Sequence, residues 1–383
     1  MSTAPQPPAA TPAGCPISAE VLPPNTRKHV DPAAPVPLRM MAAKAMVPLA
    51  PVDMLGALFM LTFDADASVR ETATKTAAAL PDRFSAGLRD ENVAPQVLGW
   101  LLPLLRTKDA FAEMLVLNTT TPDEAVAQVA RDCSAKVAEI IGQNQLRVLR
   151  HEDILRQLCT NPNASPALID NVCDFAVRSG LALADVPQMQ AARVRLFGPQ
   201  AAAAVPEPGP TAEEVIAEFQ ADGANEKVED EDPNPPPMEE VKRQSLTQRI
   251  MKMSIAQKIK LATLGNKEAR GHLLRDTNKL VCTAAIRSPR ITAGEILNCA
   301  GNKAVNEEIL RYIYNSREWT KNYKIKMALL KNPKLPLAVG MKFLNTLREN
   351  DVKDLSRDKN VPSGLQGVAK KMLEKKNEKK EEK

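Results

Sequence analysis

Side chains that could act as catalytic groups are few in this chain and lie far apart. Its three histidines are His29, His151 and His272, and its six cysteines are scattered without a C-x-x-C pair or a nearby histidine. His151 precedes Glu152, but a two-iron site would need several such His–Glu pairs, so this single pair does not build one. We therefore expect no metal site and no cofactor, and we interpret the cysteines as buried structural thiols.

Sequence signatures of the common enzyme classes are also missing. The segment Gly265-Asn266-Lys267 lacks the glycine spacing of a phosphate-binding loop, and the chain has no G-x-S-x-G sequence. One enzyme class stays open, because Arg275 and Asp276, with Trp319 downstream, are similar to the basic, acidic and aromatic residues of helical-repeat DNA glycosylases. That alternative weakens if no pocket gathers two or more of Glu268, His272, Arg275, Asp276 and Trp319. We expect a protein that is not an enzyme.

Charge is the strongest pattern with a chemical meaning. Residues 1–240 hold 19 Lys and Arg against 32 Asp and Glu, whereas residues 241–383 hold 32 against 14. A basic half favours an anionic partner, either an acidic protein or a nucleic acid, although it could also receive the acidic linker or be a solvated surface. The side chains that we expect to face such a partner are Lys258, Lys260, Lys267, Arg270, Arg275, Lys279, Arg287 and Arg290.

Four aromatic residues lie near this basic segment: Tyr312, Tyr314, Trp319 and Tyr323. Their rings could stack on nucleic-acid bases, which is how many single-strand binders work. We favour packing between helices, because Tyr312 and Tyr323 flank a turn and Trp319 opens a helix. No sequence signature of an RNA or DNA module is present, so binding to nucleic acid rests on charge alone.

Turns built on Asn or Ser divide the helices that must position these side chains. Asn332 before Pro333 ends one helix, because the residue before proline is pushed out of the helical region. Pro336 then suits the first position of the next helix, where its missing N–H is no loss. We interpret as architectural the turn residues Asn118, Pro122, Asn161, Pro162, Pro166, Ser288, Pro289, Asn332, Pro333 and Pro336.

The spacing of these turns indicates an internal repeat. Asn118 and Asn161 are 43 residues apart, and Ser288 and Asn332 are 44 apart. When the two blocks are aligned on their first turns, Val126, Val129 and Ala130 coincide with Ile296, Cys299 and Ala300. Such a period is typical of a helical repeat that hides its apolar face by stacking on a neighbour. We expect about three short helices in each unit.

The Asn-Pro segments Asn161–Pro166 and Asn332–Pro336 make the chain resemble α-helical solenoids of the HEAT and leucine-rich-repeat-variant type. The segment Lys258–Arg270 is similar to uncharacterised bacterial proteins with two helical-repeat parts. The resemblance implies an all-α architecture whose surfaces serve partners, and it implies little about activity.

We therefore predict two α-solenoid-like repeat domains joined by a disordered linker rich in Pro and Glu. The expected order is a disordered Pro/Ala-rich tail (1–36), an acidic repeat domain (37–198), a disordered acidic linker (199–243), a basic repeat domain (244–373) and a charged tail (374–383). A short helix over Thr211–Phe219 could form inside the linker and serve as a docking peptide, but we favour a solvated segment there. No apolar run is long enough to span a membrane, and the unpaired cysteines suit a reducing cytoplasm.

These expectations combine into a functional hypothesis. The protein would act in the cytoplasm as a scaffold or adaptor that binds another protein with an acidic surface through its repeats. The alternative is a nucleic-acid-binding protein that uses the same basic domain. Salt dependence separates the two, because binding to nucleic acid weakens steeply as salt rises.

Overall fold

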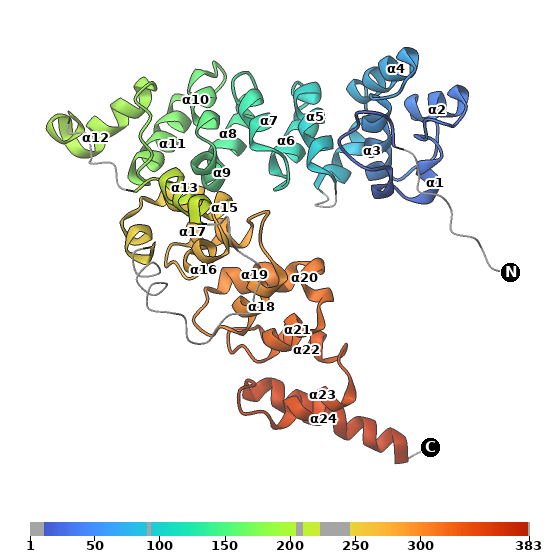
Figure 1. Ribbon diagram of the computed structural model, residues 1–383, viewed down its shortest axis with the longest axis vertical. Helices are drawn as coiled ribbons and strands as arrows, with labels where there is room; N and C mark the ends of the chain where they lie inside the picture. The colour runs from blue at the N-terminus through green and yellow to red at the C-terminus, as the bar shows by residue number, and fades with distance from the viewer. Residues whose placement is uncertain (1–10, 90–92, 204–209, 223–245, 382–383) are drawn as a thin grey trace. The chain divides into compact units, whose positions relative to one another are not determined.

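The computed structural model describes residues 11–89, 93–203, 210–222 and 246–381. Over these residues the chain is all-α: short helices follow one another through tight turns, and none of the described residues forms a β-strand (Figure 1). This confirms the prediction of an all-α protein. The chain divides into two compact units. Unit 1 is Met1–Arg178 with Ala182–Ala204, and unit 2 is Ser179–Leu181 with Val205–Lys383.

Unit 1 begins earlier than expected. The segment predicted to be a disordered tail contains the 3-10 helix η1 (Ala19–Val21), helix α1 (Pro24–Arg27) and the start of α2 (Val36–Ala43). Leu22 and Val30 are buried there. The prolines of this segment open helices instead of preventing them, because the first helical positions need no N–H donor. The prediction of disorder was therefore wrong for residues 11–36, and residues 1–10 lie outside the described part.

The other helices of unit 1 are α3 (Pro51–Leu61), α4 (Ala67–Ala78), η2 (Asp82–Arg89), α5 (Pro95–Leu105), α6 (Asp109–Leu117), α7 (Asp123–Ala130), α8 (Ala135–Gln143), α9 (Gln145–Arg150), α10 (Glu152–Thr160), α11 (Pro166–Arg178) and α12 (Pro187–Ala203). Helices α3, α5, α7 and α10 each contact the next of this series, and η2, α6, α8 and α11 form a second such series. The fully buried Leu58, Leu98, Leu101 and Phe111 belong to these helices. Each helix thus hides its apolar face on its neighbours.

The helices of unit 2 are α13 (Ala212–Asp222), α15 (Ile255–Leu264), α16 (Lys267–Leu273), α17 (Lys279–Ile286), α18 (Ala293–Gly301), α19 (Glu307–Asn315), α20 (Arg317–Lys321), α21 (Tyr323–Leu330), α22 (Leu337–Leu344), α23 (Glu349–Arg357) and α24 (Ser363–Glu381). Residues 246–252 are also helical. Helix α13 lies inside the predicted linker, and α24 continues through most of the predicted charged tail. The acidic run 229–232 lies outside the described residues.

Buried side chains at the repeated turns bond to the end of an earlier helix. The side-chain amide of Asn332 donates to the carbonyl oxygens of Ala300 (3.0 Å) and Asn302 (3.1 Å), and its Oδ1 accepts the N–H of Lys334 (3.0 Å). Asn161 donates in the same way to the carbonyl of Ala130 at 2.8 Å. These bonds satisfy carbonyls that a helix end leaves without partners.

The two other turns follow the same rule with different atoms. Asn118 donates to the carbonyl of Leu88 at 2.6 Å, and the Ser288 hydroxyl bonds to the carbonyl of Thr263 at 3.4 Å. All four turn residues are buried. Each turn therefore fixes its own chain direction and also ties consecutive helical layers together.

The aligned repeat blocks have the same helical order, with one helix more than expected. Val126 and Val129 in α7 are buried, as are their counterparts Ile296 and Cys299 in α18. Four helices, not three, separate the turns in both blocks: α7 to α10 in unit 1 and α18 to α21 in unit 2. The additional ones are α9 and α20, which are too short to produce an apolar period of their own.

Candidate binding surface

The eight cationic residues that the sequence singled out occupy three different environments in unit 2. Five of them are exposed, namely Lys267, Arg275, Lys279, Arg287 and Arg290. Two others, Lys258 and Lys260, are half-buried in ion pairs. The eighth, Arg270, is buried. The charge pattern therefore identified a basic region, and in the structure five of its eight cationic residues are exposed to a partner.

Arg270 is a correction to the expected surface. Its guanidinium pairs with the Glu295 carboxylate through two hydrogen bonds of 2.9 and 3.1 Å, and it also donates to the carbonyl of Gly265 at 2.9 Å. Only 4% of each side chain in the pair is exposed to solvent. A buried cation needs such a partner because removal from water costs several kcal/mol. Arg270 therefore joins α16 to α18 and does not face a ligand.

Lys258 and Lys260 use their charges within unit 2. The Lys258 Nζ lies 2.9 Å from Oδ2 of Asp276, and the Lys260 Nζ lies 2.5 Å from Oε1 of Glu213 on α13. The hydrogen bond from Lys260 lowers the pKa of the Glu213 carboxyl, so Glu213 is ionised at neutral pH. Part of the segment predicted to be linker thus docks on α15.

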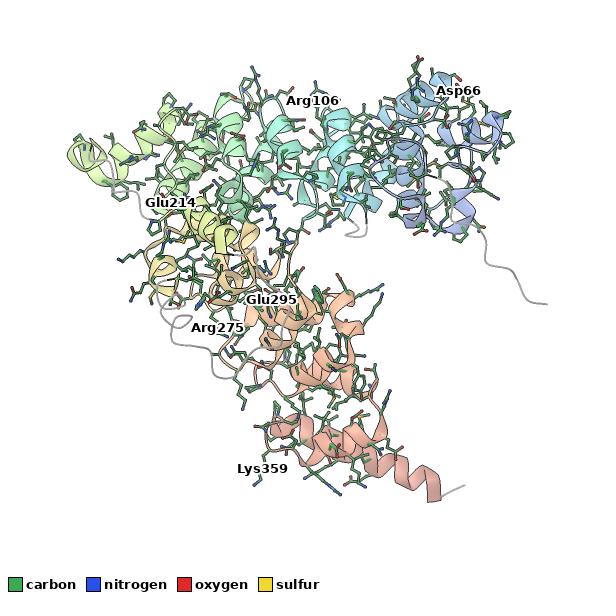
Figure 2. The ribbon with its side chains drawn as sticks, viewed as in Figure 1. Asp66, Arg106, Glu214, Arg275, Glu295 and Lys359 are labelled. Atoms are coloured by element: carbon green, nitrogen blue, oxygen red, sulfur yellow. The ribbon has the colours of Figure 1, made fainter. Side chains whose placement is uncertain are left out.

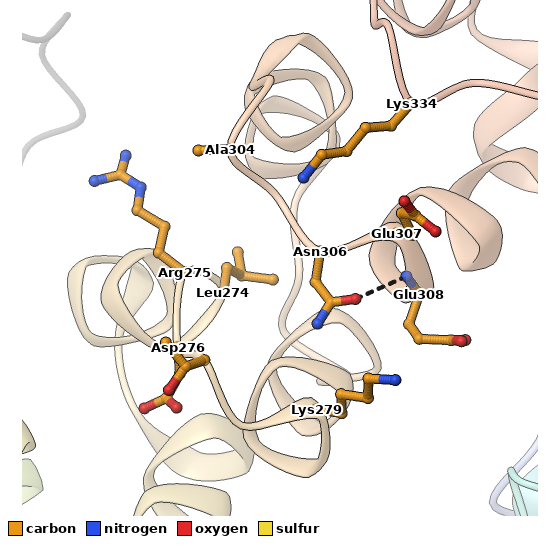
Figure 3. A pocket seen from close by; sticks show the side chains of 10 residues that line it. Leu274, Arg275, Asp276, Lys279, Ala304, Asn306, Glu307, Glu308 and Lys334 are labelled. Carbon is orange, nitrogen blue, oxygen red and sulfur yellow. Dashed lines mark hydrogen bonds between the residues drawn. The ribbon is translucent and has the colours of Figure 1, made fainter.

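A pocket of about 460 Å³ lies beside the exposed cations (Figure 3). We call it the α17–α19 pocket, because it lies at the turns that precede these two helices. Its lining residues are Leu274, Arg275, Asp276, Thr277, Lys279, Ala304, Asn306, Glu307, Glu308 and Lys334. Its volume is within the range of sites that hold a small ligand or a side chain of a partner.

Three turns with Asn or Asp position the lining of this pocket. Asp276 Oδ1 accepts the N–H of Asn278 at 2.8 Å, immediately before α17. Asn306 caps α19 by accepting the N–H of Glu308 at 3.1 Å (Figure 3). The Asn332 turn brings in Lys334, whose Nζ donates to the carbonyl of Val305 at 2.7 Å. Short side chains that bond to nearby backbone thus hold the pocket in shape.

The charges around the α17–α19 pocket are unevenly neutralised. Asp276 is paired with Lys258, and Glu308 lies 3.7 Å from Arg311. Arg275 and Lys279 are exposed, and neither makes an ion pair with another described residue. Figure 2 places Arg275 at the edge of unit 2, whereas Glu295 lies among its helices. The pocket therefore presents two exposed cations, Arg275 and Lys279, beside the exposed carboxylate of Glu307. Sequence reasoning missed Lys334, which joins the pocket from a distant turn.

The aromatic residues near the basic segment are half-buried. The Arg287 guanidinium lies 5.6 Å from the ring centre of Tyr312, and the Arg348 guanidinium lies 5.7 Å from that of Tyr323. The Tyr323 hydroxyl also donates to the Asp351 carboxylate. Cations over these rings are stabilising contacts within unit 2 and leave less ring surface for stacking on bases.

The pocket gathers two of the five residues named for the glycosylase alternative, Arg275 and Asp276, while Glu268, His272 and Trp319 are not among its lining. Asp276 already accepts hydrogen bonds at both oxygens, from Lys258 and from the N–H of Asn278.

Over the described part of the chain, no three His, Cys, Asp or Glu side chains are placed to hold a metal ion.

All six cysteines are free thiols. Burial raises the pKa of Cys133 and of Cys299 to about 11, so these thiols stay protonated. Cys159 and Cys173 are different, because their sulfur atoms lie only 3.8 Å apart across α10 and α11. No sequence pattern indicates this pair, because the two positions meet only through the packing of the helices.

Comparisons of the chain with protein families, with curated proteins and with solved structures found no match. No helix in the described ranges has the length and apolar character needed to cross a membrane.

Proposed function

We propose that unit 2 binds an acidic segment of another protein and that the α17–α19 pocket is the centre of this binding surface. The observation that carries the proposal is the pair of exposed cations, Arg275 and Lys279, at a pocket that three turns hold in shape. Cations that are prepositioned but not neutralised attract anionic partners and set their orientation. In this role the protein is a cytoplasmic scaffold, and its turns stack HEAT-like repeats into a solenoid.

A protein partner fits this surface better than a nucleic acid does. Glu307 and Glu308 lie on the same pocket as the cations, and carboxylates repel a phosphate backbone. A peptide can place an acidic side chain at Arg275 and keep other charges away from Glu307. The half-buried tyrosines, covered by Arg287 and Arg348, add little stacking surface.

Charge reversal at the pocket tests the proposal. The affinity of a fluorescent peptide rich in Asp and Glu is measured for the full chain and for the variant Arg275→Glu/Lys279→Glu. We expect the variant to bind about tenfold or more weakly, because each exposed charge contributes up to about 1 kcal/mol and reversal adds repulsion.

The matched control is Lys370→Glu/Lys371→Glu, which makes the same change in net charge on exposed residues of α24. Its affinity should stay near that of the wild type. Equal losses in both variants would mean that only the net charge of unit 2 matters, and the pocket would lose its role.

A further inference from the structure

Helix α13 begins with a reciprocal cap. The N–H of Thr211 donates to Oε2 of Glu214 at 3.0 Å, and the N–H of Glu214 donates to the Thr211 hydroxyl at 3.2 Å. This capping box satisfies two backbone donors at the helix start. A helix of this length is marginal in water by itself, so its order depends on the surface beneath it.

That surface is α15. Ala212 and Val215, one helical turn apart, are fully buried. The N–H of Ala212 donates to Oε1 of Gln257 at 2.9 Å, and Glu213 pairs with Lys260 at 2.5 Å. The apolar face of α13, with Glu213 at its edge, therefore packs against the apolar face of α15, with Lys260 at its edge.

Among the described residues, this contact includes the two buried side chains, the hydrogen bond from the Ala212 N–H and an ion pair whose Glu213 side chain is 56% exposed. The helix belongs to the same chain, and this covalent linkage keeps its effective concentration at α15 high. A separate helix with the same pattern and a few more contacts would compete with it.

We infer that the face of α15 covered by α13 is a binding site for acidic amphipathic helices, and that α13 is its internal occupant. The inference goes beyond the proposed function, because the site lies on α15 and not at the α17–α19 pocket. It specifies the ligand: a helix with a capping Thr-x-x-Glu start, a small residue at its first position and a β-branched residue three positions later. The partner's first-turn carboxylate would take the place of Glu213 at Lys260. Binding then requires release of α13.

A synthetic peptide of residues 210–222 tests the inference on the full-length chain. Val215→Asp removes the buried anchor of the internal helix, and Ala217→Asp is the matched control on the exposed side of the same helix. We expect the labelled peptide to bind the Val215→Asp chain at least tenfold more tightly than either the wild type or the control, because only there is α15 uncovered. Equal affinity for all three chains would overturn the inference.

A charge exchange fixes the location of the peptide. In the Val215→Asp chain, the further change Lys260→Glu should weaken the wild-type peptide, and a peptide with Glu213→Lys should recover the affinity. Absence of recovery would show that the peptide binds elsewhere. The circular dichroism of the helices checks that each variant folds. A second variant, Thr211→Ala/Glu214→Ala, removes the cap of α13 by changing only exposed or half-buried residues. It should bind the peptide as the Val215→Asp chain does.

Two further results separate the possible outcomes. Arg275→Glu/Lys279→Glu should leave the affinity for this peptide unchanged, so failure at α15 and failure at the α17–α19 pocket are distinguishable. A wild-type dimer that dissociates on Val215→Asp would show that α13 reaches a second copy, and this would overturn occupancy within one chain.

Discussion

Arg270 and Glu295 form an ion pair inside unit 2, with two parallel hydrogen bonds and almost no exposure to solvent. Glu295 also accepts the backbone N–H and the hydroxyl of Thr292, both at 2.8 Å, at the start of α18. One carboxylate thus caps its own helix and anchors α16. This relationship links the stability of the basic unit to a charge that is unavailable to partners.

Removal of Arg270 should destabilise unit 2 strongly. Arg270→Met leaves the Glu295 carboxylate buried without its partner, and we expect a loss of about 3–5 kcal/mol. Urea unfolding followed by Trp319 fluorescence, in a Trp100→Phe background, reports on unit 2 alone. The control Arg311→Ala breaks an exposed pair with Glu308 and should cost less than about 1 kcal/mol.

A second substitution distinguishes buried charge from lost packing. Adding Glu295→Gln to Arg270→Met removes the unpaired charge, so part of the lost stability should return. If the double variant is as unstable as the sum of its single variants, the two side chains do not interact as described.

Asn332 should contribute more to stability than an ordinary turn residue. Asn332→Ala removes two donors to buried carbonyls and one acceptor for a backbone N–H, and we expect a loss of about 2–3 kcal/mol in the same unfolding measurement. Asn298→Ala, at an exposed position of α18, is the control and should change stability little. Similar values for both variants would contradict the structural role of the turn.

Cys159 and Cys173 should be the pair that oxidises first. Hydrogen peroxide oxidises one thiol to a sulfenic acid, and the second peroxide oxygen leaves as water. The second thiol then attacks that sulfur, the S–S bond forms and another water leaves. The sulfurs start 3.8 Å apart, and formation of the bond lowers the intact mass by two hydrogen atoms. Cys159→Ser should abolish the link, whereas Cys282→Ser should not; oxidation that is equal in both variants would refute the pairing.

Acid should destabilise unit 1 through His29. This side chain is buried and its Nδ1 has no partner, and burial followed by the charge of Lys28 lowers its pKa below 6.5. The folded state therefore prefers the neutral ring, so its stability is fully present above about pH 6.5 and falls below that value. The loss approaches about 1.4 kcal/mol per pH unit while only the unfolded chain is protonated.

Unfolding followed by Trp100 fluorescence, in a Trp319→Phe background, measures this dependence in unit 1. His29→Gln should flatten it below about pH 6.5, where the unfolded chain takes up the proton that the buried ring does not. A pH profile that is unchanged by His29→Gln would rule out this histidine as the cause.

The sequence predicted the helical architecture because local chemistry determines it. Proline after Asn332 and apolar periods in α18 and α22 act within a few residues, so they are visible without a structure. The roles of individual turn residues are less visible: Gly265 and Asn266 end α15 with φ angles of −69° and −78°, outside the left-handed region, and Asn266 caps the start of α16. An Asn can stop one helix or begin the next, and the pattern does not distinguish these roles.

The candidate site was less predictable because burial and pairing depend on residues far apart in the chain. Arg270 resembles its exposed neighbours in sequence, yet Glu295, 25 positions away, draws it into the interior. Lys334 enters the α17–α19 pocket from the turn at Asn332, and Val215 docks α13 on a helix 40 positions later. No local pattern records such contacts.

The most direct measurement for the central claim is a competition on the full chain near physiological salt. A labelled acidic peptide is bound first, and an unlabelled single-stranded DNA of equal charge is then titrated in. We expect the DNA to displace the peptide only at a large excess, and Arg275→Glu/Lys279→Glu to release the peptide without DNA. Displacement at equimolar DNA, with an affinity that falls steeply as salt rises, would contradict a protein-binding role.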